Sequence, residues 1–187
     1  MSYKKFLIAD PHFGHWGVCK FLRSDRTKLR PWDNPNEMDE FMVQKWNETV
    51  RPVDTVYVLG DVAINRRCLP ILSRLNGKKN LIKGNHDIFQ MKDYVPYFKD
   101  IRAYHYIDGY MMSHIPIHTE SLGRYKCNIH GHIHDREVLL PTTIERRIDA
   151  RYLCVSVEHI DYTPIEWDAA LERIKIRQEE NLTLKRI

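Results

Sequence analysis

The chain has 187 residues, of which 43% are hydrophobic and 29% are charged, and its formal net charge is +4. This length fits a single domain over residues 1–187 with a sizeable core, and the composition excludes a disordered, collagen-like or fibrous chain. The mild positive charge is compatible with an anionic substrate, but it is weak evidence for nucleic-acid binding because no run of five basic residues occurs.

The cysteines and the N-terminal residues give information about the cellular compartment of the protein. The four cysteines are scattered, and none has the C-x-x-C spacing of a zinc knuckle or a redox dithiol. Free thiols in a reducing compartment are therefore the favoured interpretation. The first apolar run, from Phe6 to Ala9, is too short for a signal peptide or a membrane span. We expect a cytoplasmic protein without a membrane partner.

Short apolar runs predict the strands. Each run is bounded by turn residues or by polar residues, and its continuous apolar character is typical of a strand that is buried on both faces. The pattern is clear in the first three runs and weaker in the last three. In chain order the expected strands cover residues 6–9, 55–59, 80–82, 110–113, 127–129 and 152–157.

Helical patterns lie between the first strands and after the last one. Apolar residues recur at helical spacing over 35–50, where Asn36 is the expected N-cap. A shorter helix is expected over 68–75, stopped by Gly77, and another from 164 to about 180. Strands that alternate with helices predict an α/β fold.

Acidic residues, histidines and an asparagine follow five of the expected strands. In an open α/β sheet, ligands gather at the carboxyl ends of the strands. Each segment alone is more typical of a turn than of a binding site, but five together indicate one site at a common edge. The segments are Asp10-Pro11-His12, Gly60-Asp61, Gly84-Asn85-His86-Asp87, Ser113-His114 and Gly131-His132-Ile133-His134.

The side chains in these segments suit divalent metal ions. Imidazole, carboxylate and amide oxygen are ligands for Mn, Fe, Zn or Ni, and the lack of thiolates argues against a structural zinc site. Two divalent cations, with Asp10, Asp61 and one bridging hydroxide, would leave the site with a charge of about +1. A net-positive site favours a phosphate anion, and metal binding makes hydroxide available near neutral pH.

The series D-x-H, G-D, G-N-H-D, H and G-H-x-H resembles the calcineurin-like metallophosphoesterase superfamily, over residues 10–134. The stretches 10–15 and 54–61 further resemble small phosphoesterases of bacteria and phages. The resemblance implies a four-layer α/β/β/α sandwich of two mixed sheets. It also implies two divalent transition-metal ions, with Mn favoured over Fe, Ni or Zn. The first ion would be bound by Asp10, His12 and His134, the second by Asn85, His114 and His132, and Asp61 would bridge both.

The resemblance also assigns roles beside the metals. His86 corresponds to the histidine that stabilises or protonates the leaving group, and Asp87 is expected to orient its imidazole and to favour the charged form. Many members carry a polar or acidic residue three positions after the bridging aspartate, where this chain has Ile64. That departure leaves metal binding intact but weakens any substrate inferred from relatives with the acid.

Three further residues are candidates for substrate contacts. His15 lies three residues after His12 and could reach the substrate or pack over the loop. Arg124 lies in the polar segment 119–126 between two ligand-bearing strands and His118 directly precedes it, and a loop there could cover the site. An ordinary solvated loop is the more frequent outcome for such a segment.

The implied activity is hydrolysis of a phosphate ester by in-line attack of a metal-bridging hydroxide. A phosphodiesterase acting on small or nucleotide diesters is favoured over a monoesterase. The site is expected to be open, because no added domain or long insertion exists to build a deep selective pocket. A nuclease is the nearest alternative, although a concentrated basic track is missing from the sequence. A non-catalytic scaffold that binds a partner protein is disfavoured, since all seven ligand positions and His86 are filled. The oligomeric state is open.

Overall fold

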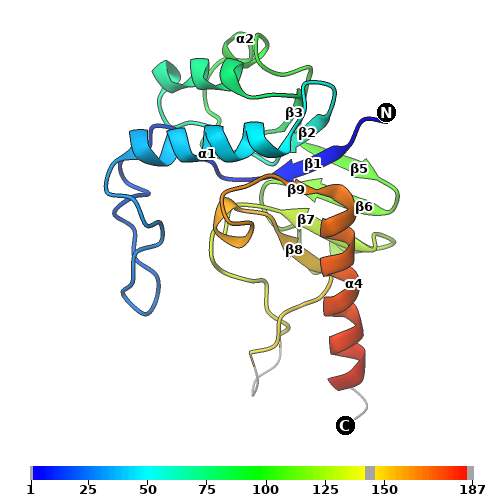
Figure 1. Ribbon diagram of the computed structural model, residues 1–187. Helices are drawn as coiled ribbons and strands as arrows, with labels where there is room; N and C mark the ends of the chain where they lie inside the picture. Colours follow the sequence, from blue (N-terminus) through cyan, green and yellow to red (C-terminus); the bar gives the residue numbers. More distant parts are fainter. Residues whose placement is uncertain (1, 142–145, 185–187) are drawn as a thin grey trace.

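The computed structural model describes residues 2–141 and 146–184 and is an α/β structure with two mixed sheets and several helices (Figure 1). The α/β prediction is therefore confirmed. The larger sheet has five strands in the order β4–β3–β2–β1–β9. Strands β1 to β4 are parallel, and β9 is antiparallel to β1. These strands are β1 (Lys5–Ile8), β2 (Thr55–Val58), β3 (Lys78–Ile82), β4 (Asp100–Arg102) and β9 (Ile165–Glu166).

The second sheet has four strands in the order β5–β6–β7–β8, with an antiparallel β5–β6 pair and parallel neighbours beyond it. A parallel bridge between Ala9 and Ser156 joins the ends of β1 and β8. The Ala9 amide donates to the Val155 carbonyl at 2.9 Å. The carboxyl ends of the parallel strands in both sheets therefore meet at one edge. The strands are β5 (Tyr104–Ile107), β6 (Tyr110–Ser113), β7 (Cys127–His130) and β8 (Tyr152–Cys154).

Helix α1 (Pro35–Thr49) confirms the first helical pattern and packs on the larger sheet. Its buried residues Met38, Met42 and Trp46 belong to the hydrophobic cluster that also contains the β1 and β2 side chains. The N-cap is Asn34 rather than the expected Asn36, because the Asn34 side chain accepts a hydrogen bond from the Asn36 amide at 2.9 Å.

The other predicted helices differ in type or start. The second is a 3₁₀ helix, η1 (Arg66–Arg74), with Pro70 inside it. Proline disfavours the α-helix because it has no N–H and clashes with the carbonyl four residues before it. The third, α4 (Trp167–Leu184), starts later than expected, since residues 165 and 166 pair with β1. The remaining short helices are α2 (Met91–Tyr94), α3 (Thr119–Leu122) and η2 (Val157–His159).

None of the helices in the described ranges combines the length and apolar character that crossing a bilayer requires.

Candidate metal centre

Six of the seven predicted metal ligands form two groups at the shared edge of the sheets. Within each group the ligand atoms lie within 4.8 Å of one another. The side chains come from the loops after β1, β2 and β7 and from the residue after β6. The first group is Asp10, His12 and His134, and the second is Asp61, His114 and His132.

The carboxylate of Asp61 lies between the two groups. Its Oδ2 atom is 3.3 Å from Nε2 of His114 and 3.7 Å from Nε2 of His12. Its Oδ1 atom accepts a hydrogen bond from the His86 amide at 2.8 Å, which leaves Oδ2 directed at the imidazoles. One oxygen of Asp61 is thus in reach of cations held by either group.

Asn85, the seventh predicted ligand, joins the second group through His114. Its Oδ1 atom is 2.9 Å from Nε2 of His114. The other ring nitrogen of His114 donates to the Leu59 carbonyl at 2.8 Å, and this bond directs Nε2 toward the ligand atoms of Asn85 and Asp61.

The backbone is strained at the ligands. Left-handed conformations are unfavourable for residues with a Cβ, by about 1–2 kcal/mol each, and they collect at functional sites. A close approach of the loops adds a further demand at Gly84, where a Cβ would lie 2.1 Å from Oδ1 of Asp61. The ligands with positive φ are Asp10 (56°), His12 (52°), Asp61 (55°), His132 (71°) and His134 (53°).

The surroundings of Asp10 fit a bound cation. Its Oδ2 atom accepts hydrogen bonds from the Ser156 hydroxyl at 2.6 Å and the His132 amide at 2.8 Å. Its Oδ1 atom is buried and has no hydrogen-bond partner, although it lies 3.9 Å from Nε2 of His12. A buried carboxylate oxygen without a donor is unfavourable unless a cation neutralises it. The donor set of carboxylate, imidazole and amide oxygen suits divalent transition metals.

Burial and neighbouring charges shift the pKa values of the candidate ligands. Burial lowers the pKa of His12 well below its usual value, and the charge of Arg30 lowers it further, so this ring is neutral and available as a ligand. Burial opposes protonation of His114 as well. Its contacts with Asp61 and Asp10 outweigh that effect and raise its pKa to about 9. A cation that binds at neutral pH therefore displaces a proton from His114.

A buried ion pair, which the sequence analysis did not identify, supports the first group. Arg30 is fully buried and its Nε atom lies 2.8 Å from Oε1 of Glu158. The same guanidinium donates to the Asp10 carbonyl at 2.7 Å. Oε1 of Glu158 is also 3.1 Å from Nδ1 of His134. Arg30 and Glu158 thus hold the Asp10 loop and the His134 ring in place, as outer partners of metal ligands do.

His86 and Asp87 do not have the mutual arrangement that was expected. His86 is exposed, and its ring centroid lies 5.8 Å from that of His12. Asp87 is buried and accepts hydrogen bonds from the amides of Asp61 (2.8 Å), Gly84 (2.8 Å) and Val62 (3.0 Å). Within the described ranges it makes no hydrogen bond to the His86 ring. Both of its oxygens are used by these amides, so Asp87 braces the two ligand loops instead of orienting the imidazole.

Of the candidate substrate contacts, only His15 lies beside the metal ligands. Its ring centroid is 5.4 Å from that of His12, and it meets Phe21 edge to face at 5.9 Å. His118 caps α3, where its Nδ1 atom accepts from the Glu120 amide at 3.3 Å. Arg124 is exposed beyond α3. In the part of the chain that the structure describes, neither His118 nor Arg124 hydrogen bonds to a ligand residue.

A cavity of about 660 Å³ adjoins the first group, with His134 in its wall. It lies between the segment 21–29 and the segment 133–139, and Arg146 also lines it. Phe21 and Leu22 line it and are 47% and 61% exposed, which leaves apolar surface facing the cavity. Arg23, beside them, pairs with Asp135 across the cavity at 3.3 Å. Side chains of both apolar and basic character therefore surround a space next to the candidate metal ligands.

Comparison with known proteins finds chains that are similar to this one. No family model matches the sequence. The uncharacterized protein MJ1445 of Methanocaldococcus jannaschii is 33% identical over 181 residues, which cover 94% of this chain and 94% of that protein. The crystal structure of the protein of unknown function AQ665 from Aquifex aeolicus aligns with a TM-score of 0.63 and 24% identity, over 88% of this chain and 96% of that one. The second likeness concerns the fold alone.

Proposed function

The chain belongs to the family of the Methanocaldococcus jannaschii protein MJ1445, and we propose that it is a two-metal phosphoesterase of the calcineurin-like type with that superfamily's four-layer sandwich. The observation that supports this most is the position of Asp61, whose Oδ2 atom lies 3.3 Å from His114 and 3.7 Å from His12. A carboxylate between two ligand groups is the arrangement that a dinuclear centre needs.

The residues of the two groups would hold a pair of divalent transition-metal ions, with manganese favoured. Such a pair, when bound, supplies a nucleophile from water near neutral pH and positive charge for the phosphoryl oxygens. The chain itself contributes orientation. Ser156 and the His132 amide fix the Asp10 carboxylate, the Leu59 carbonyl fixes the His114 ring, and Glu158 fixes the His134 ring.

His86 is the proposed proton donor to the leaving oxygen. Its ring is exposed and close to the first group, with 5.8 Å between its centroid and that of His12. An exposed imidazole beside a reacting ester is within reach of the leaving oxygen. Its backbone amide is bonded to Asp61, which fixes the place of the residue relative to the ligand pair.

The substrate that we propose is a small or nucleotide phosphodiester. The cavity of about 660 Å³ beside His134 has the size of a small-molecule site. Phe21 and Leu22 offer apolar surface to the organic part of an ester. Arg136 offers a positive charge to the phosphoryl oxygens of that ester. A diester places organic groups on both sides of phosphorus, so one of them can enter this cavity.

Hydrolysis assays test the proposal. The protein is stripped of metal, resupplied with Mn, Ni, Zn or Mg, and given bis(p-nitrophenyl) phosphate or p-nitrophenyl phosphate. We expect metal-dependent turnover, faster for the diester, that falls by at least about a thousandfold in Asp61→Ala. Asp168→Ala, at an exposed position of α4, serves as the matched control and keeps its activity. Turnover that survives in Asp61→Ala, or no turnover with any metal, overturns the proposal.

A further inference from the structure

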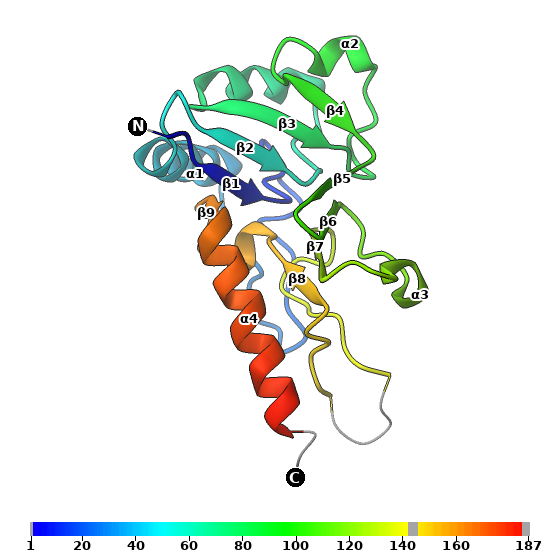
Figure 2. The ribbon, with the colours of Figure 1, turned by 90° about the vertical axis from the view of Figure 1, so that its right-hand side faces the viewer.

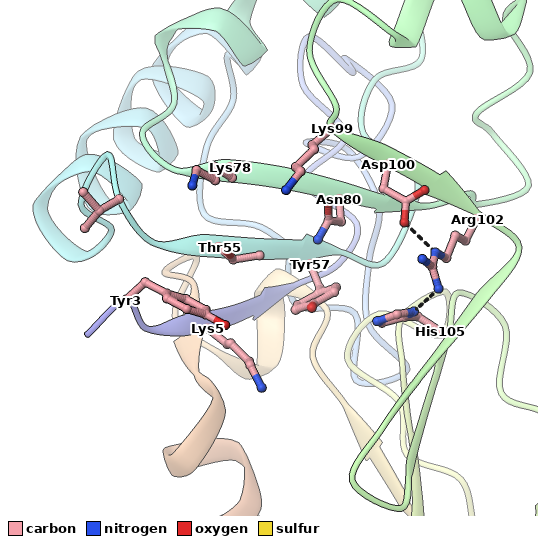
Figure 3. Close-up of a pocket in the computed structure, with 11 residues that line it drawn as sticks. Tyr3, Lys5, Thr55, Tyr57, Lys78, Asn80, Lys99, Asp100, Arg102 and His105 are labelled. Carbon is pink, nitrogen blue, oxygen red and sulfur yellow. Dashed lines mark hydrogen bonds and ion pairs between the residues drawn. The ribbon is translucent and has the colours of Figure 1, made fainter. Parts of the chain in front are cut away.

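A second cavity, of about 600 Å³, lies on the open face of the five-stranded sheet. Figure 2 shows α1 and η1 behind this sheet, and no described helix covers the front of β2 and β3. The cavity is lined by residues near the starts of β1 to β4, among them Lys5, Thr55 and Lys78 (Figure 3). It is therefore at the end of the strands opposite to the candidate metal centre.

The lining of this cavity is strongly basic. Lys5, Lys78, Lys99 and Arg102 contribute four positive charges from separate parts of the sequence. Asp100 is the one acidic side chain among the described residues that line it, and it is bonded to Arg102 at 2.5 Å. The Nζ atom of Lys5 lies 5.8 Å from the centroid of the Trp167 ring, so the ammonium groups of Lys78 and Lys99 are the ones that remain without a carboxylate inside the cavity.

Lys78 and Lys99 are the two basic residues of the lining that are best placed to bind an anion. Figure 3 shows both side chains extending over the face of β3, with their Nζ atoms on the same side of the cavity. Both residues are exposed, and within the described ranges neither makes an ion pair. Like charges held near each other repel, so an anion between them would be favoured over the empty arrangement.

The other wall of the cavity is rigid. Arg102 is held between Asp100 and Nδ1 of His105, at 2.5 Å and 2.7 Å. The His105 ring stacks on Tyr57 with 5.3 Å between centroids and 18° between planes. A preformed wall of this kind lowers the entropy lost when a small ligand binds.

We propose that this cavity binds a small molecule with a chain of two or more phosphate groups, of the nucleoside diphosphate class. The phosphates lie between Lys78 and Lys99. Tyr3, which is 61% exposed and lines the same cavity, offers a ring on which the base stacks. A cavity of about 600 Å³ has the volume of a small-molecule site, and this favours a nucleotide over a nucleic-acid strand.

This site is separate from the candidate metal centre. Thr55 lines the cavity at the start of β2, whereas Asp61 follows the other end of the same strand, so the two sites lie at opposite ends of β2. The inference therefore does not rest on the proposed phosphoesterase activity, and it can be tested with metal ions removed.

Calorimetric titration in EDTA is the test, with ADP, pyrophosphate and adenosine as the three probes. We expect ADP to bind best and pyrophosphate more weakly. Lys78→Ala/Lys99→Ala should weaken ADP by about tenfold, whereas Lys20→Ala/Lys175→Ala, an exposed pair with the same loss of charge, should bind as the unmodified chain does. Tyr3→Ala should weaken ADP but leave pyrophosphate unchanged.

Four outcomes would overturn the inference. The first is that neither ADP nor pyrophosphate binds, and the second is that the two double variants lose the same affinity for ADP. The third is that Asp61→Ala no longer binds ADP. The fourth is that a single-stranded oligonucleotide binds through Lys78 and Lys99 more tightly than ADP does. Circular dichroism of each variant shows that it is folded, so a loss of binding reports on the cavity itself.

Discussion

At the scale of single residues, the carboxylates of the candidate metal centre are each fixed by hydrogen bonds to one of their two oxygens. Oδ2 of Asp10 is fixed by Ser156, while its Oδ1 has no hydrogen-bond partner. Asp61 has the reverse arrangement, since its Oδ1 is fixed by the His86 amide and its Oδ2 faces the imidazoles. In each carboxylate one oxygen is used by the protein and the other is directed at the place of a cation.

The close approach of Gly84 to Asp61 gives the first prediction. A Cβ at residue 84 would lie 2.1 Å from Oδ1 of Asp61 and 2.5 Å from its amide nitrogen. Gly84→Ala is therefore expected to displace Asp61 and to weaken binding of Mn²⁺ by about tenfold or more. The control is Gly123→Ala, where φ is +46° but a Cβ has open space. Calorimetry with Mn²⁺ measures both, and equal affinities would contradict the expected displacement.

Glu158 gives the second prediction. Glu158→Gln keeps the size of the side chain but removes the charge that Arg30 and His134 share. The uncompensated buried Arg30 should lower the free energy of unfolding by about 3 kcal/mol, and metal affinity should fall by about 10- to 100-fold. Urea unfolding and Mn²⁺ titration are compared with Glu172→Gln, an exposed control on α4. A variant with unchanged affinity would show that Glu158 does not support the ligand His134.

At the scale of the elements, the short segment before β2 connects the starts of three parallel strands. Asp54 is buried, and its Oδ1 atom accepts from the Lys4 amide at 2.8 Å, next to β1. Its backbone carbonyl accepts from the Lys78 amide of β3 at 2.8 Å. The carboxylate also binds the Arg51 guanidinium, with 2.7 Å between Oδ1 and Nη2. One aspartate thus aligns β1, β2 and β3.

The pH dependence of stability should report on Asp54. The hydrogen bond with Arg51 lowers the pKa of Asp54 despite burial. Because the folded pKa lies below that of the unfolded chain, about 3.9, the carboxylate stabilises the fold above that pH and loses this effect as the pH falls toward the lowered value. Asp54→Asn should therefore lower the free energy of unfolding by about 2 kcal/mol at pH 7, and the difference should shrink below about pH 4.

Urea unfolding at pH 7, 5 and 3 measures this difference. Glu172→Gln, at an exposed position in the middle of α4, should show no such dependence. A stability difference between the unmodified chain and Asp54→Asn that is the same at all three pH values would contradict a charged, hydrogen-bonded Asp54.

At the scale of the whole molecule, the two sheets contribute to one edge. Asp10, His12 and Asp61 follow strands of the five-stranded sheet, and His114 and His132 follow strands of the other. The Ala9–Ser156 bridge joins the sheets at this edge. Cations held there would cross-link the sheets, so metal binding and folding are coupled.

Thermal unfolding should therefore depend on metal. At a free Mn²⁺ concentration of about 100 times Kd, one bound ion stabilises the folded state by about 2.7 kcal/mol, which corresponds to a rise in Tm of about 5–10 °C for a chain of this size. EDTA should reverse the rise, and Asp10→Ala should reduce it. A Tm that is the same with Mn²⁺ and with EDTA would show that no ion is bound at this edge.

Much of this arrangement is predictable from the sequence, because the apolar runs are continuous and polar ligands directly follow them. The predictions at 6–9, 55–59 and 80–82 correspond to β1, β2 and β3. Strands β4 and β5 have no such pattern, since β4 is partly charged and Tyr104 and Tyr106 of β5 are exposed. These strands depend on pairing with a neighbour rather than on their own apolar residues.

Long-range contacts account for what the sequence could not predict at the sites. Arg30 lies between Leu29 and Pro31 in the sequence, and nothing there shows that it pairs with Glu158, 128 residues away. Glu158 itself follows an expected strand, as the ligands do, and this was the one available signal. The basic cavity is equally hidden, because Lys5, Lys78 and Lys99 meet only when the strands are aligned.

The central claim is a phosphoesterase that needs two metal ions, and the most direct test is to measure turnover against metal equivalents. Metal-free protein at a concentration far above Kd is titrated with Mn²⁺ while hydrolysis of bis(p-nitrophenyl) phosphate is followed. The account predicts little turnover up to one equivalent per chain, a steep rise to two, and a plateau beyond two. Full activity at one equivalent, or no activity at two or more, would contradict it.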